Sequence, residues 1–183
     1  QLYYSKNPLN DLFSFTISVD FGLLEDNRLA VARDFMDKSG TPRFSSEKLK
    51  KEWYRLGTEL RIDPGDHETT IRISGLDENF GPSLALLVES LQQPTASDST
   101  LAELIRIILA KREDARKDHR TISRALYQFN RLGENSYYHR VPSNQQLQQF
   151  TPAELHDLIR SLLSYEHTLT YTGSLPLEEV LEQ

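Results

Sequence analysis

Alternating apolar and polar residues predict the strands of this chain. From Phe13 to Phe21 every second residue is apolar, with Ser, Thr and Asp between them. This period of two is typical of a strand with one buried face. Residues 57–62 and 68–74 alternate in the same way around Asp63-Pro64-Gly65-Asp66, whose residue types favour a tight turn, so they predict a hairpin. A last strand is expected at residues 167–171.

A period of 3.6 predicts helices in the rest of the chain. Asp26 is a candidate N-cap for a helix that runs to Ser39 and stops at Gly40. Residues 151–154, Thr-Pro-Ala-Glu, form a capping box with proline at the first helical position and predict another helix start. Further helices are expected at residues 46–56, from Leu76 to the residue before Pro94, from Leu101 into a charged tail at 111–120, and at 122–129.

This order of elements predicts an α+β fold, a single sheet with helices packed on one face. One domain is expected to span residues 1–183, with Phe15, Ile17 and Leu87 in its core. The chain does not begin with Met, and it stops inside an apparent helix at residues 178–183. We therefore expect a piece of a longer protein that exposes an apolar or aromatic patch, for which the candidates are Tyr3, Tyr4, Tyr137 and Tyr138.

Composition narrows the classes of partner. The chain has 21 Lys and Arg against 27 Asp and Glu, a net charge of −6, which provides no overall basic character for nucleic acid or acidic lipid. No apolar run approaches the ~18–20 residues that cross a bilayer, so membrane insertion is not expected. The absence of cysteine is compatible with a reducing or an oxidising compartment. Localisation therefore stays open, and a periplasmic or otherwise exported protein fits as well as a cytoplasmic one.

Candidate chemistry is sparse. None of the five histidines, His67, His119, His139, His156 and His167, has a second histidine four residues away, the spacing that aims two imidazoles at one metal ion. This favours surface or capping roles for them, although His139, in the aromatic and basic segment 137–140, is the most site-like. Glu113 and Asp114 lie among basic residues, where ion pairs along a helix are expected. No G-x-S-x-G or phosphate-binding loop occurs.

Three segments in this order carry a family resemblance: residues 39–45, Ser-Gly-Thr-Pro-Arg-Phe-Ser; residues 74–80, Ser-Gly-Leu-Asp-Glu-Asn-Phe; and the closing strand from Tyr165 to Gly173. They resemble one repeat of the insulinase/pitrilysin family of zinc peptidases, which has a LuxS/metallohydrolase-like fold. The resemblance covers nearly the whole chain. It implies four related domains in two halves that close around a peptide, with zinc in one half only.

The family's zinc motif, H-x-x-E-H, precedes a glycine-threonine pair, and the resemblance places it on residues 31–35 of this chain. Val31 and Phe35 then stand at the two histidine positions, and neither side chain can bind a metal. Asp34 falls at the position of the general base, and Asp114 or Glu113 falls near that of the third ligand. No catalytic, cofactor-binding or metal site is therefore expected in this chain.

The resemblance implies a non-catalytic, chamber-forming and substrate-enclosing domain, the first of the C-terminal half of a zinc metallopeptidase. Its partners would be the other domains of the same polypeptide and a peptide substrate, and zinc would lie in the catalytic half. The alternative is a structural scaffold that resembles the core subunits of respiratory complexes and has no peptidase activity. An H-x-x-E-H motif, or its inverted-order equivalent, upstream of Gln1 would distinguish the two.

Overall fold

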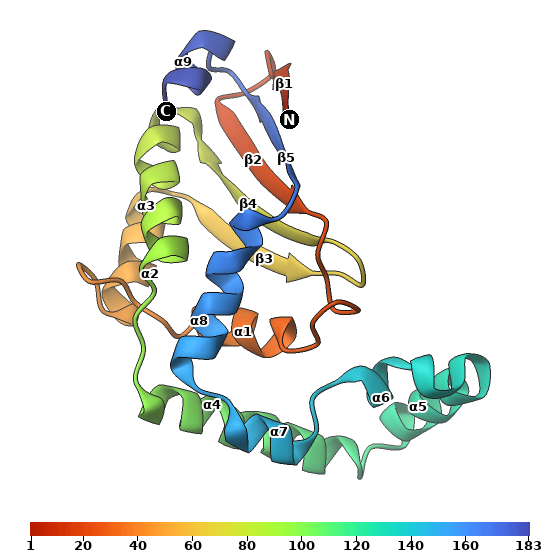
Figure 1. The fold of residues 1–183 in the computed structure, drawn as a ribbon. Coiled ribbons are helices and arrows are strands. Elements are labelled where there is room, and N and C mark those ends of the chain that lie inside the picture. The colour runs from red at the N-terminus through yellow and green to blue at the C-terminus, as the bar shows by residue number, and fades with distance from the viewer.

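The computed structural model describes residues 1–183, which form one five-stranded sheet with the strand order β1-β5-β2-β4-β3 (Figure 1). The strands are β1 (Leu2–Lys6), β2 (Leu12–Val19), β3 (Glu59–Pro64), β4 (Thr69–Leu76) and β5 (His167–Gly173). β1 pairs with β5 in parallel, and all other neighbours are antiparallel. The final strand of the chain thus lies between the first two.

Nine α-helices accompany the sheet: α1 (Leu29–Met36), α2 (Ser46–Arg55), α3 (Phe80–Gln92), α4 (Asp98–Ala115), α5 (His119–Leu132), α6 (Tyr137–Arg140), α7 (Asn144–Gln149), α8 (Pro152–Ser161) and α9 (Leu177–Glu182). The capping box at Thr151 forms as predicted, because the Thr151 hydroxyl accepts from the Glu154 N–H and the Glu154 carboxylate accepts from the Thr151 N–H. No helix combines the length and the apolar character that crossing a bilayer requires.

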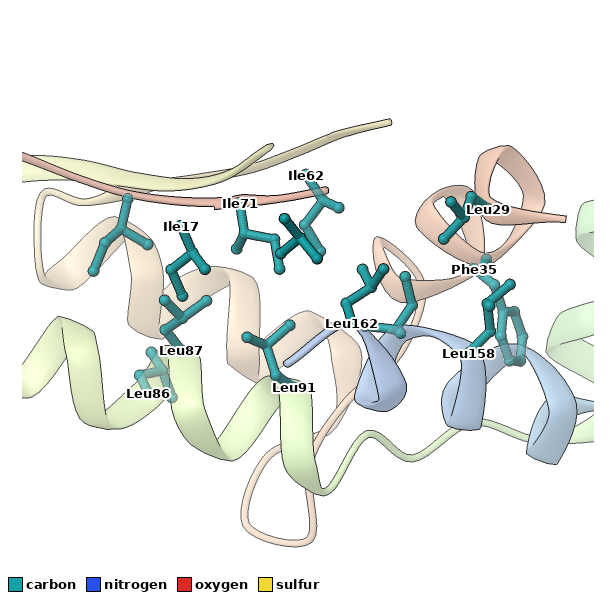
Figure 2. Packing of buried hydrophobic residues seen from close by; sticks show 14 of the residues in the cluster. Ile17, Leu29, Phe35, Ile62, Ile71, Leu86, Leu87, Leu91, Leu158 and Leu162 are labelled. Carbon is teal, nitrogen blue, oxygen red and sulfur yellow. The ribbon is translucent and has the colours of Figure 1, made fainter. Parts of the chain in front are cut away.

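The core lies on one face of the sheet. Phe13, Phe15, Ile17 and Val19 of β2 are buried, and the Ser and Thr residues between them are only partly covered. Figure 2 shows side chains of the sheet, including Ile17 and Ile71, meeting Leu87 and Leu91 from the helical layer. The predicted α+β class and the predicted core positions Phe15, Ile17 and Leu87 are confirmed.

Tyr171 of β5 lies at the centre of this core and is completely buried. Its hydroxyl donates to the buried carboxylate of Asp77 at 2.8 Å, and the second oxygen of Asp77 accepts from the Ser174 N–H at 3.0 Å. Burial, followed by the hydrogen bond to Asp77, raises the pKa of Tyr171 well above its usual value. The contact ties the last strand to the turn that leads from β4 into α3.

Several predicted boundaries are wrong. Asp26 does not cap α1, which begins at Leu29, because its carboxylate instead accepts from the backbone and side chain of Arg28 in the preceding turn. Leu76 belongs to β4, and α3 begins only at Phe80 after a short 3-10 turn. β1, α6 and α7 were not predicted from the sequence.

Helix α5 does not cover the sheet. It extends from the far end of α4, away from the sheet, together with α6 (teal in Figure 1), and no residue of α5 is buried. The apolar stripe that predicted this helix is therefore exposed, with Ile122, Leu126 and Phe129 between 39% and 59% accessible. We call residues 116–142 the arm.

The predicted exposed patch is found on the arm, and only some of the expected residues belong to it. Tyr137 and Tyr138 lie on α6 with their rings 5.6 Å apart, and both are exposed. Tyr3 is exposed on β1, outside the arm. Tyr4 is not part of any patch, because its ring stacks on Tyr171 and its hydroxyl donates to the Leu175 carbonyl.

Replacing Phe15 tests the assignment of the two sheet faces. Phe15 is 6% exposed and packs edge-on against Phe80, so Phe15→Ala should lower the free energy of unfolding by about 3–5 kcal/mol, because transfer and cavity terms add. Its neighbour Thr16 points to the other face, so Thr16→Ala should change it by no more than about 0.5 kcal/mol. Urea unfolding measures both. A larger loss of stability in Thr16→Ala than in Phe15→Ala would show that the two sheet faces are assigned the wrong way round.

Candidate functional site

Helix α1 carries the residues that the resemblance aligns with the zinc motif, and two of them are packed in the core. Val31 and Phe35, at the two histidine positions of the motif, are buried members of the hydrophobic core. Figure 2 shows Phe35 extending toward α8, near Leu158. The ring of Phe35 stacks on the imidazole of His156 from α8, with centroids 4.9 Å apart and planes 22° apart. Phe35 thus packs against α8.

The surface or capping role predicted for His156 is wrong, because this side chain is buried. Its Nε2 lies 3.0 Å from the Ser39 hydroxyl, just beyond the end of α1. The Ser39 hydroxyl donates its only proton to the Phe35 carbonyl at 2.8 Å, so it must accept from His156, and Nε2 carries the hydrogen. Burial lowers the pKa of His156, which favours the neutral ring.

The predicted end of α1 at Ser39 is wrong, because the helix ends at Met36 and Gly40 lies in the segment that follows it. Gly40 forms an antiparallel bridge with Thr95, in the segment that joins α3 to α4. A Cβ atom at residue 40 would collide with the Phe44 carbonyl and lie 2.9 Å from the Ser46 nitrogen. Only glycine allows the 41–46 loop to fold this tightly, which explains the Gly40-Thr41 pair physically.

A cavity of about 950 Å³ opens beside α1, between that helix, α4 and the arm. Val31 and Asp34 line it, together with Lys111, Arg112 and Arg116 of the α4 end. Asp34 pairs with Arg33 at 3.2 Å. Asp114 is exposed and does not line the cavity, and Glu113 forms the predicted helical ion pairs with Arg116 and Lys117, each at 3.6 Å. Of the four motif positions, the structure thus groups Val31, Asp34 and Phe35 on α1 and leaves Asp114 apart.

The remaining histidines do not converge. His67 lies 3.7 Å from Glu25 on the surface, and His139 lines the cavity with its ring 5.3 Å from that of Phe129. No three His, Cys, Asp or Glu side chains are grouped closely enough to hold a metal ion. The cavity beside α1 combines positive charge with apolar surface and could bind a ligand of matching character. It offers no set of metal ligands.

Solved structures share this fold. The peptidase M16 inactive domain from Pseudomonas fluorescens matches with a TM-score of 0.79 at 14% identity, over 98% of this chain and 45% of that one. The periplasmic protease PqqL from Escherichia coli matches with a TM-score of 0.77 at 17% identity, over 95% of this chain and 20% of that one. The ferredoxin protease FusC, in complex with Arabidopsis ferredoxin, gives 0.83 at 15% identity, over 99% and 20%.

The chain therefore has the fold of a peptidase M16 domain, and the resemblance to one repeat of the insulinase/pitrilysin architecture is confirmed at the level of the fold. It spans less than half the length of these solved chains. No family model matches the sequence, and no curated protein matches it either.

His156 should make stability depend on pH. Because burial lowers its folded-state pKa, the stability it contributes is complete above its unfolded-state pKa of about 6.5 and is lost as pH falls toward the folded-state value. His156→Gln removes this titration. The difference in free energy of unfolding between wild type and variant should therefore shrink from about pH 7.5 to about pH 5. Exposed His119, replaced by Gln, is the control, and a loss in His156→Gln equal to that in wild type would contradict the assignment.

The purified chain should hold no stoichiometric zinc and cleave no peptide, because a zinc hydrolase needs three protein ligands and the chain offers Val31 and Phe35 at two of the positions. Val31→His with Phe35→His should still give little activity, since both positions lie in the hydrophobic core, which was not built to orient metal ligands. Elemental analysis after dialysis is the test. One tightly bound zinc per chain, with hydrolysis abolished by a chelator, would contradict it.

Proposed function

We propose that this chain is a non-catalytic domain of a larger zinc metallopeptidase, in which it forms part of the wall of the chamber that encloses the peptide substrate. The hydrolysis would occur in a different domain that carries zinc. The resemblance to peptidase M16 domains, one of them described as inactive, supports a non-catalytic role. The packing of Val31 and Phe35 supports it independently, because this chain's own motif helix is part of the core.

The main support for a role as chamber wall is the face of the sheet opposite the core. Its residues are exposed or half-exposed, and most are small hydroxyl side chains: Ser14, Thr16 and Ser18 of β2, Thr70, Arg72 and Ser74 of β4, and Thr168, Thr170 and Thr172 of β5. Arg72 donates to the Ser14 hydroxyl at 3.0 Å, which holds its charge close to the sheet. The result is a broad polar surface with little net charge.

Such a surface suits a chamber wall. Hydroxyl groups both donate and accept hydrogen bonds and rotate freely, so they can solvate a peptide of any sequence without fixing its register. A wall packed permanently against another domain would be more apolar, as obligate interfaces are. The Ser and Thr face therefore supports contact with water and with a changing substrate.

The complete polypeptide, or this chain with its zinc-bearing partner, provides the test. An H-x-x-E-H motif or its inverted form should be encoded beside this chain, and hydrolysis should stop when zinc is chelated. Thr170→Arg, which puts a long cation on the exposed sheet face, should lower kcat/KM by about tenfold, or about 1.4 kcal/mol, without loss of zinc.

Gln145→Arg is the matched control, because Gln145 is an exposed neutral residue on α7, away from the sheet face, and its replacement should leave kcat/KM unchanged. Equal effects of the two variants on kcat/KM would contradict the proposal that the sheet face lines the chamber. Absence of both a zinc motif and zinc-dependent hydrolysis would favour the scaffold role instead.

A further inference from the structure

We propose that the cavity between α1, α4 and the arm is a binding site for a short acidic peptide segment that carries an aromatic or aliphatic side chain. The proposal goes beyond the proposed function, because the cavity lies among the helices and not on the Ser and Thr face of the sheet. Three observations carry it: the shape of the cavity, its unpaired cations, and the distribution of charge along the chain.

The cavity has the size and surface of a peptide subsite. Its volume of about 950 Å³ is at the upper end of the ~300–1,000 Å³ typical of ligand pockets, and more than half of its 19 lining residues are hydrophobic. The apolar wall comes from Ile122 and Leu126 of α5, which are 39% and 59% exposed, and from Tyr138 of α6. A hydrophobic side chain seated here would cover an amphipathic helix that buries nothing in the chain itself.

The opposite wall carries positive charge without a matching anion. Arg112 is half-buried, yet its guanidinium donates only to the neutral Asn144 side chain, at 2.7 Å, and pairs with no carboxylate. Burial lowers the pKa of Arg112, which reflects the cost of removing this charge from water. A carboxylate entering the cavity would supply the missing charged partner, and Lys111 lines the same wall.

The only carboxylate in the lining belongs to Asp34, and it is already paired with Arg33. Across residues 111–140 there are eight Lys and Arg against four Asp and Glu, although the whole chain has 21 against 27. The arm and the end of α4 are thus a basic region on an acidic protein.

The contrast between this basic region and the acidic remainder of the chain favours a short peptide as the ligand. A long polyanion, such as a nucleic acid, or an anionic membrane surface would also meet the acidic remainder of the chain, which has 13 Lys and Arg against 23 Asp and Glu. A peptide of a few residues contacts the basic region alone. It can place a carboxylate at Arg112 and an apolar side chain at Leu126 together.

Fluorescence anisotropy with three labelled peptides on the intact chain tests the proposal: one of Glu residues around a single Phe, the same peptide with Gln for Glu, and the same with Ala for Phe. The first peptide should bind saturably, and its affinity should fall as salt is added. The other two peptides should bind at least about tenfold more weakly. Arg112→Gln should weaken the first peptide by about tenfold, and Lys111→Gln, which alters an exposed side chain, by a smaller factor.

Arg124→Gln is the matched control, because Arg124 is exposed on α5 and does not line the cavity, and the same change of charge there should alter binding less than about twofold. Equal effects of Arg112→Gln and Arg124→Gln, or equal binding of the Gln peptide, would overturn the site. A concentration-dependent dimer that Arg112→Gln abolishes would assign the cavity to a second copy instead. Zinc-dependent hydrolysis by the complete polypeptide is measured separately, so a failure here leaves the proposed function standing.

Discussion

The hydrogen bond from Tyr171 to Asp77 is the contact on which the rest of the domain depends. A carboxylate that is only 5% exposed is stable only if its oxygens are occupied, and Tyr171 and the Ser174 N–H occupy both. The turn after β4 and the end of β5 are thereby held together although 94 residues separate Tyr171 from Asp77. Gly173 follows from the same contact, because a Cβ atom there would collide with the Tyr171 hydroxyl and the Asp77 carboxylate.

A second consequence of burial concerns α1. Phe35 is fully buried and contributes its whole ring to the α1–α8 contact. Packing of this kind is difficult to reverse, because a buried imidazole needs hydrogen-bond partners that only His156 currently has. Replacing Phe35 by a metal ligand would therefore cost stability in the core.

Elements with strong local signals could be predicted from the sequence. The alternation in residues 13–21 gave β2 and its buried face, and the capping box at Thr151 gave the start of α8. The fold class followed from their order. Ser143 and Gln146 form a second capping box, which was a readable signal for α7, and the alternation of Leu2 and Tyr4 was a weaker one for β1.

Other features depend on contacts that no local pattern contains. The apolar stripe of α5 predicts a helix, but the same stripe describes a covered helix and an exposed one, and only the fold shows that nothing covers it. His156 has no neighbour in sequence that marks it as buried, because its partners Phe35 and Ser39 lie more than a hundred residues away. The cavity likewise requires α4 and the arm to meet α1.

The position of β5 in the sheet has a consequence for biosynthesis. A ribosome delivers β1 and β2 first, yet the strand that separates them is made more than 140 residues later. Until then the nascent chain has β2, β4 and β3 as a possible partial sheet, with one edge of β2 unpaired, and unpaired edges invite association with other chains. Pairing across such a sequence distance is also slow. We expect folding of this domain to depend on prompt synthesis of its C-terminal strand. A polypeptide that ends before β5 would then aggregate rather than form a smaller folded domain.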